Sequence, residues 1–130
     1  MRTQVVDSIK SLALNGISLS NELPYDESGS AIYIKNPKTL YVDRTQYESV
    51  PIIQTLNGLN INNTTTTVTV YLAVDAKNPL TQLDSIINSL RGIENTLVLE
   101  GTHTRESTVS TDYENDLLIV NVEYRLTRIN

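Results

Sequence analysis

The sequence predicts an α+β fold, in which a mostly antiparallel β-sheet carries two helices packed on one face, plus an extra β-hairpin. Three observations support this fold class. The chain ends in a long segment with a period of two, it contains two segments of helical periodicity, and its strand-like segments mostly follow one another through turns. A chain of 130 residues is long enough to bury its own core, so we expect a single domain over residues 1–130.

The clearest strand is the last one, residues 116–129. Alternate side chains are apolar along its length, which predicts one fully buried face: Leu118, Val120, Val122, Tyr124 and Leu126. The other face begins with Leu117 and Ile119 and then becomes polar, so we expect it to be covered only at its start. A strand of this length needs a partner. The best candidate is residues 96–107, which residues 109–115 would connect to the last strand.

Two segments have the spacing of amphipathic helices. The first is expected to be capped by Thr3 and to end at Gly16; its apolar side chains are Val5, Val6, Ile9, Leu12 and Ala13. The second is expected to begin with Asn78 as cap and Pro79 as first helical residue, and to end at Gly92. Its apolar stripe consists of Leu80, Leu83, Ile86, Ile87 and Leu90.

Residues 31–35 and 39–43 flank an Asn-Pro-Lys turn and are predicted to form a β-hairpin. In such a hairpin Tyr33 and Tyr41 point away from the apolar face. One interpretation is that a neighbouring loop of the same chain shelters them. The alternative is that they contact another subunit, because tyrosine is favoured at protein interfaces, and this makes them candidate interface residues.

The central part of the chain predicts an edge strand, a polar loop and a middle strand. Pro51 suggests that the strand within residues 47–56 lies at an edge or that the strand starts there. Residues 60–67 are rich in Asn and Thr and predict a mobile loop, whereas residues 67–74 alternate clearly. The uncovered sheet face, which includes Arg125, is expected to meet solvent or a partner, so Arg125 is also a candidate interface residue.

The sequence shows no catalytic or metal-binding pattern. A lone histidine, His103, lacks an evident nucleophile and orienting acid. Asp112, Glu114 and Asp116 have the spacing of a calcium loop, but Leu117 stands where such a loop needs glycine, so we interpret them as a solvated acidic loop. There is no cysteine. We therefore expect a protein that is not an enzyme and has no cofactor and no metal.

The chain carries 15 acidic and 10 basic residues and a net charge of −5, which argues against sequence-independent binding to nucleic acid. No segment has the length and apolar character of a membrane-spanning helix or of a signal peptide. We therefore expect synthesis in a cytoplasm and no membrane partner.

The second half of the chain resembles a known family. A Thr-Val-Thr-Val-Tyr-Leu-Ala-Val strand is followed by a turn with proline, a helix, a strand with Glu-Gly-Thr-His-Thr-Arg, an acidic loop and the closing Asp-Leu-Leu-Ile-Val-Asn-Val-Glu-Tyr run. This layout is similar to that of the tail terminator, or tail completion, proteins of long-tailed bacteriophages of the lambda U type. The likeness covers residues 48–127; the hairpin at 31–43 has no counterpart in it.

The resemblance implies a structural virion protein at the head–tail junction, made in the host cytoplasm. Such proteins form a ring, usually a hexamer, that caps the tail tube and offers a surface to the head connector. The implied partners are therefore further copies of the chain, the tail tube protein and the head connector or neck protein. Genome DNA would pass through the ring without specific binding. We therefore expect acidic or Thr-rich residues at the lumen or rim, and the candidates are Thr64, Thr65, Thr66, Asp112, Glu114 and Asp116.

Two alternatives remain open from the sequence. The first is a head-closure or neck protein of the same connector. The second is a small enzyme or ligand-binding domain, which an apolar pocket with converging charges would favour.

Overall fold

The structure is a computed structural model of the chain and describes residues 1–54, 58, 60–77, 82–98 and 101–129. Side-chain surroundings are described for these residues except 52–54, 60, 102, 103 and 129. The elements in chain order are α1 (Arg2–Leu12), β1 (Ser18–Leu19), α2 (Ile32–Lys35), β2 (Thr39–Val42), β3 (Gln46–Gln54), β4 (Asn60–Asp75), α3 (Leu83–Gly92), the 3₁₀ turn η1 (Ile93–Thr96), β5 (Thr102–Glu114) and β6 (Leu117–Ile129).

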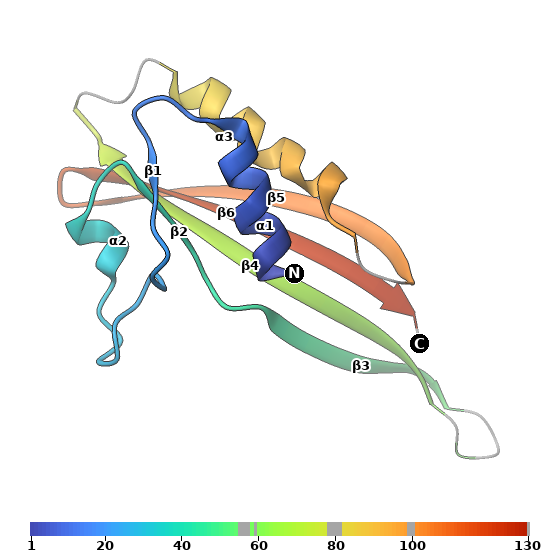
Figure 1. The fold of residues 1–130 in the computed structure, drawn as a ribbon. Helices are drawn as coiled ribbons and strands as arrows, with labels where there is room; N and C mark the ends of the chain where they lie inside the picture. The colour runs from blue at the N-terminus through green and yellow to red at the C-terminus, as the bar shows by residue number, and fades with distance from the viewer. Residues whose placement is uncertain (55–57, 59, 78–81, 99–100, 130) are drawn as a thin grey trace.

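All six strands belong to one sheet, in the order β1-β2-β4-β6-β5, and β3 pairs with β4 on the same side as β2. Every pairing is antiparallel except β1 with β2. Figure 1 shows α1 and α3 lying on one face of this sheet. The short helix α2 packs on the other face, against β2, β4 and the start of β6. The predicted class, a mostly antiparallel sheet with two helices on one face, is confirmed.

β6 has one fully buried face, as its alternation predicts, and it lies inside the sheet between β4 and β5. It pairs with β4 from Ile129 to Leu117 and with β5 over nearly the same length. The buried face holds Val120, Val122, Tyr124 and Leu126 at no more than 1% exposure, and Leu118 packs at its border. The predicted pairing with the preceding strand is confirmed, although that strand begins at Thr102 and continues to Glu114.

The helices close the core through the side chains that their spacing selects. Val5 and Ile9 of α1 and Ile86 and Leu90 of α3 are buried against β4 and β6, whereas Ile87 is only partly buried. Helix α1 starts at Arg2 without the predicted Thr3 cap and ends at Leu12, followed by the C-cap residue Ala13, which adopts φ +48°. The predicted end at Gly16 was wrong. The chain leaves the helix earlier, and Leu14 and Ile17 of the following segment pack against the core. The predicted start of α3, including Leu80, lies outside the described residues.

The predicted hairpin at residues 31–43 was wrong in its first half. Residues 32–35 form the short helix α2, and only residues 39–42 form a strand, which pairs with β4 and β1. The physical reason is that α2 packs across the sheet: Tyr33 of α2 lies in a second small core with Tyr41, Ala73 and Ile119. A helical turn presents Tyr33 to this core while the flanking Ile32 and Ile34 pack at its border.

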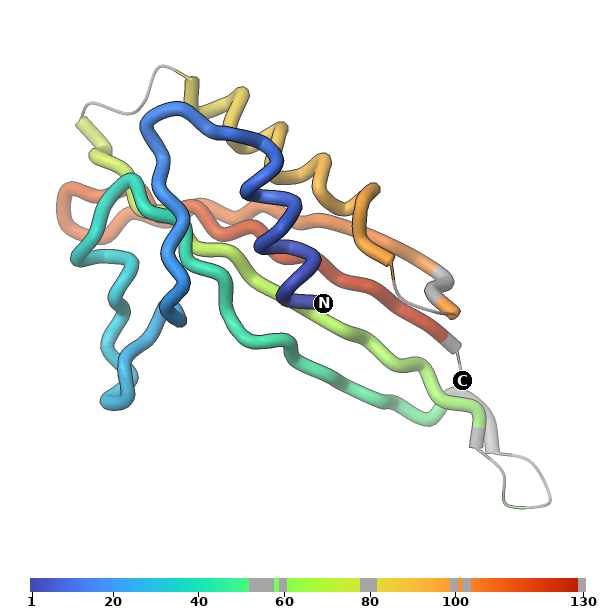
Figure 2. Tube along the Cα trace, viewed as in Figure 1, coloured from blue at the N-terminus to red at the C-terminus, as the bar shows by residue number. Residues whose placement is uncertain are grey.

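Two segments expected to be loops are strands. Residues 60–67 form the first half of β4, because β3 pairs with them on one side and β6 on the other. Residues 109–114 continue β5, so the connection to β6 is a turn at Asn115 and Asp116, where Asn115 adopts φ +57°. The edge position of β3, predicted from Pro51, is confirmed, since β3 pairs only with β4 among the described strands. Figure 2 shows the β3–β4 ribbon extending beyond the two helices as an arm.

Candidate functional site

The sheet face opposite α1 and α3, which we call the open face, is polar over most of its area. Strand pairing places on it alternate residues of β4, β6 and β5: Thr65, Thr67, Thr69, Asn121, Glu123, Arg125, Thr127, Thr104, Glu106, Thr108 and Ser110. The same parity of β4 continues to Tyr71 and Ala73, where α2 covers the sheet. The predicted division of this face into a covered start and an uncovered polar part is therefore observed.

Arg125 lies in the middle of the open face and is paired with two carboxylates. Its Nη2 lies 3.0 Å from Oε1 of Glu123, and its Nη1 lies 3.8 Å from Oε1 of Glu106. All three side chains are partly exposed, so each pair contributes at most about 1 kcal/mol to stability. The two glutamates leave this cluster with a net negative charge.

Three other arginines lie on the opposite side of the sheet. Nε of Arg105 donates to the Leu97 carbonyl at 2.7 Å, and Nε of Arg2 donates to the Val42 carbonyl at 3.1 Å. Arg128 shares the buried parity of β6, and its Nε has no hydrogen-bond partner among the described groups. The basic side chains of the strands are thus separated from the open face, apart from the neutralised Arg125.

The covered end of the open face is a cluster of three tyrosines. The rings of Tyr33 and Tyr71 are stacked with centroids 4.8 Å apart, and Tyr25 meets both edge-on at 5.9 and 5.8 Å. Burial, followed by the neighbouring Tyr25 hydroxyl, raises the pKa of Tyr33 to about 12 and raises the pKa of Tyr71 further still. The cluster packs α2 against the sheet, and its burial keeps these phenols protonated to a higher pH than an exposed tyrosine.

The loop that places Tyr25 is organised by Asp26. Its Oδ1 accepts hydrogen bonds from the backbone N–H groups of Ser28 and Ser30 at 3.0 and 2.8 Å and from the Ser28 hydroxyl at 2.7 Å. These bonds, led by the one from the Ser28 hydroxyl, lower the pKa of the exposed Asp26 carboxyl. Nothing in the sequence reasoning singled out Tyr25 or Asp26, although an Asp two residues before Ser is a known turn signal.

Tyr33 and Tyr41, the candidate interface tyrosines, are 8% and 3% exposed. The Tyr41 hydroxyl lies 2.9 Å from Nδ2 of Asn36. Of the two interpretations, shelter within the chain describes their surroundings, and neither residue presents a surface to a neighbour here. Arg125, the third candidate, is exposed on the open face.

The candidate lumen or rim residues fall in two different places. Thr65 lies on the open face, whereas Thr64 and Thr66 point to the helix side and Thr66 is 2% exposed. Asp112 and Glu114 have the open-face parity near the end of β5, and Asp116 lies in the turn, where its Oδ1 is 3.8 Å from Nζ of Lys77. In the part of the chain that the structure describes, no group of three or more His, Cys, Asp or Glu side chains is arranged to hold a metal ion. The side chain of His103 lies outside that part.

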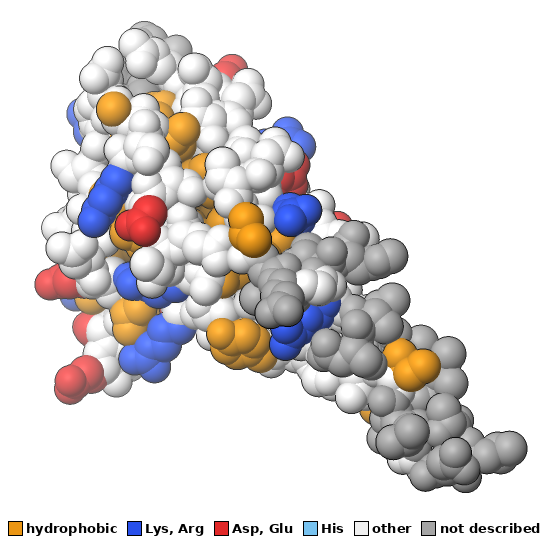
Figure 3. All heavy atoms as spheres, turned by 45° about the vertical axis from the view of Figure 1, so that its right-hand side comes forward, with side chains coloured by type: hydrophobic (Ala, Val, Ile, Leu, Met, Phe, Trp, Pro, Cys, Tyr) orange, Lys and Arg blue, Asp and Glu red, His pale blue; other side chains and the backbone are white. Residues whose placement is uncertain are grey.

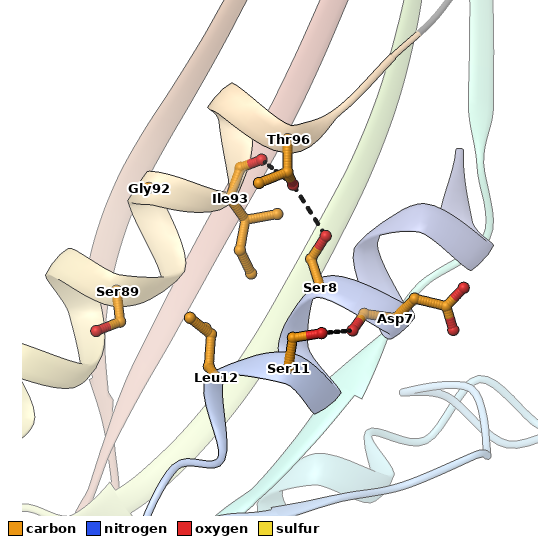
Figure 4. Close-up of a pocket in the computed structure, with 8 residues that line it drawn as sticks. All are labelled: Asp7, Ser8, Ser11, Leu12, Ser89, Gly92, Ile93 and Thr96. Atoms are coloured by element: carbon orange, nitrogen blue, oxygen red, sulfur yellow. Dashed lines mark hydrogen bonds between the residues drawn. The ribbon is translucent and has the colours of Figure 1, made fainter.

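A groove of about 500 Å³ separates α1 from α3 and η1 on the helix side (Figure 4). Leu12 and Ile93 supply its apolar surface, and its hydroxyl groups are largely bonded within the chain: Ser8 Oγ lies 2.9 Å from Thr96 Oγ1, which donates to the Ile93 carbonyl. Asp7 is the only charged residue among the described residues that line it. The groove therefore lacks the converging charges that would favour an enzyme.

Side chains on the molecular surface are mixed in charge. Figure 3 shows Lys and Arg side chains scattered among acidic and uncharged ones on the face in view. Among the described helices, none combines the length and apolar character needed to cross a membrane.

No protein-family model matches this sequence, and no curated protein matches it.

Proposed function

We propose that this chain is a structural subunit of a bacteriophage tail, a tail terminator that assembles into a ring on the tail tube and joins it to the head connector. The resemblance of residues 48–127 motivates the proposal, and the observation that carries it is the open face. A ring that lets DNA pass needs an inner wall that does not hold phosphate, and the open face has that chemistry.

The charge of the open face supports this role. A basic wall would bind DNA by releasing counterions, whereas an acidic or hydroxyl-lined wall repels or ignores the phosphates. Along the open face, Arg125 is flanked by Glu106 and Glu123. The other described positions of β4, β6 and β5 on the uncovered part are mainly Thr, Ser and Asn, and the remaining charged positions of the face, Glu48 of β3 and Asp112 and Glu114 of β5, are acidic. The strand arginines that would retain DNA, Arg105 and Arg128, point to the other side of the sheet.

The position of α2 also supports the proposal that the open face forms the inner wall of the ring. It covers only the Tyr71 end of the open face, so a broad polar strip along β4, β6 and β5 remains uncovered. Antiparallel sheets commonly leave one face to water, and a ring can use such a face as its inner wall.

Electron microscopy of the purified chain at high concentration tests the proposal directly. We expect closed rings with a central channel, and we expect phage in which the gene is deleted to produce tails of uncontrolled length that do not join heads. A protein that remains monomeric at high concentration, together with normal tails in the deletion phage, would contradict the proposal.

A charge-reversal pair tests the role of the open face. The double variant Glu106→Lys, Glu123→Lys turns the Arg125 cluster basic, and we expect its rings to retain duplex DNA at physiological salt. Asp7→Lys makes a charge reversal on the exposed surface of α1 and serves as the control, with no expected retention. If both variants bound DNA equally, the open face would not be the inner wall.

A further inference from the structure

On one side the described sheet ends in β5, and on the other side it ends in the long strand β3 and the two-residue strand β1; the outer edges of these strands have no partner in the described chain. β5 pairs only with β6, and β3 pairs only with β4, so the free edges of these two strands lie on opposite sides of the molecule. Every free edge presents backbone N–H and C=O groups that another strand can bind, and proteins usually protect such edges with lysine, proline, bulges or a covering element.

The middle of the β5 edge, residues 107–111, lacks these protections, although charged residues stand on both sides of it. Its register with β6 is uninterrupted from Thr104 to Glu114. Residues 107–111 are Ser, Thr, Val, Ser and Thr, a run without charge or proline that favours extended structure. Helix α3 contacts the helix-side face of the strand, where Ser107 Oγ donates to the Arg91 carbonyl at 3.3 Å, and among the described strands only β6 pairs with β5.

The edge of β3 offers a segment of similar length to the uncharged run of β5. Its pairing with β4 is regular from Gln46 to Pro51 and becomes irregular between Pro51 and Ile53. Because proline cannot donate to a neighbouring strand, the regular part available to a partner is residues 46–50, about as long as the uncharged run of β5.

Both edges also carry large apolar side chains in water. Tyr47 and Val50 of β3 are 73% and 50% exposed, and Tyr113 of β5 is 70% exposed. Tyr47 and Tyr113 share the helix-side parity of the sheet. An added strand at each edge would cover part of this apolar surface.

We propose that the free edge of β5 in one copy of this chain pairs with the free edge of β3 in the next copy, so that the sheets of neighbouring subunits join. The proposal deepens the proposed function and rests on its ring. The partner is a second copy because each chain carries one edge of each kind, on opposite sides, which is the arrangement that a head-to-tail closed ring requires.

The strand directions fit this pairing. β3 runs opposite to β4, β4 opposite to β6, and β6 opposite to β5, so β3 and β5 run in opposite directions within one chain. Rotation about a ring axis along the strands keeps these directions, and β5 therefore meets the next β3 in an antiparallel pair. The same rotation keeps every open face on one side of the joined sheet, which makes the polar wall continuous.

Disulfide trapping tests the pairing, because the chain contains no cysteine of its own. Glu48 of β3 and Thr108 of β5 share the open face. Within one chain β4 and β6 separate these strands, which places them about 14 Å apart, too far for a disulfide. We therefore combine Glu48→Cys with Glu106→Cys, Thr108→Cys or Ser110→Cys, to scan the register along β5.

We expect oxidation to yield a ladder of covalent multimers for one register of this scan. Ser49→Cys combined with Thr108→Cys is the matched control, because Ser49 points to the helix side and a disulfide cannot join opposite faces of a sheet. Each single-cysteine variant should give dimers at most. Unchanged thermal melts of the reduced variants ensure that a negative result concerns the interface and not folding.

Hydrogen exchange supplies a second readout. On assembly, alternate amides of residues 107–111 should become protected, while the amides already bonded to β6 should keep their rates. Rings without cross-links in any register and without new protection would overturn the edge pairing and leave the proposed function standing. A chain that forms neither rings nor cross-links would overturn both.

Discussion

Tyr124→Phe probes the point where the sheet and α3 are joined. The Tyr124 side chain is fully buried, and its hydroxyl donates a hydrogen bond to the Leu90 carbonyl in the last turn of α3. Phenylalanine fills almost the same volume, so the change removes the hydrogen bond while keeping the packing. Carbonyl groups in the last turn of a helix have no partner within the helix and depend on such donors.

The stability that Tyr124→Phe is expected to lose depends on the other hydrogen bonds of the Leu90 carbonyl. The Ile93 N–H also donates to the Leu90 carbonyl, so the variant does not leave it without any partner. We therefore expect a loss of about 1–2 kcal/mol in the free energy of unfolding, within the range for one buried hydrogen bond. For a chain of this size, about 1 kcal/mol corresponds to a fall of roughly 3–5 °C in Tm.

Urea and thermal denaturation of the parent and the variant measure this loss. Tyr113→Phe is the matched control, because Tyr113 is 70% exposed and no hydrogen bond of its hydroxyl is described. We expect the control to change stability by less than about 0.5 kcal/mol. Equal stability of Tyr124→Phe and the parent would refute the inferred role of this hydrogen bond.

Three further predictions address the core, the open face and the buried phenols. Ile86→Asp should prevent folding, because an unpaired charge at a position that is 3% exposed costs several kcal/mol of folding free energy. Ile87→Asp, at the edge of the core, should retain some folded protein. Circular dichroism melts compare the two variants. Arg125→Ala should lower the free energy of unfolding by less than about 1 kcal/mol, and urea melts at low and high salt check this; a larger loss would mean that its ion pairs are structural. The contribution of the buried phenols to stability should be constant between pH 8 and about 10. It should fall as the pH rises from there through the raised pKa values of Tyr33, which is about 12, and Tyr124, because the unfolded phenols lose their protons first; melts between pH 8 and 12 that show no such fall would contradict the burial of these groups.

Part of the open face was predictable and part was not. The polar parity of β6, including Asn121, Glu123 and Arg125, could be predicted because alternation along a strand assigns each side chain to a face. The two glutamates that neutralise Arg125 come from different strands, and only the register of β5 with β6 brings Glu106 beside it. The tyrosine cluster was missed for the same reason, since Tyr25, Tyr33 and Tyr71 lie in three separate segments.

By itself the sequence determined the elements whose apolar pattern is strong enough to select one face. The alternation from Leu118 to Leu126 specified a strand with one buried face, the stripes of α1 and α3 specified the helix layer, and Pro51 indicated an edge or a strand start, of which the edge is observed.

The tertiary structure decided the segments whose local pattern allows more than one conformation. Residues 60–67 are polar enough for a loop, but β3 and β6 bond their backbone from both sides and make them a strand. Residues 31–35 alternate like a strand, but packing of Tyr33 against Tyr71 turns them into the helix α2. In both cases the deciding hydrogen bonds and contacts come from residues distant in the sequence, which local periodicity does not contain.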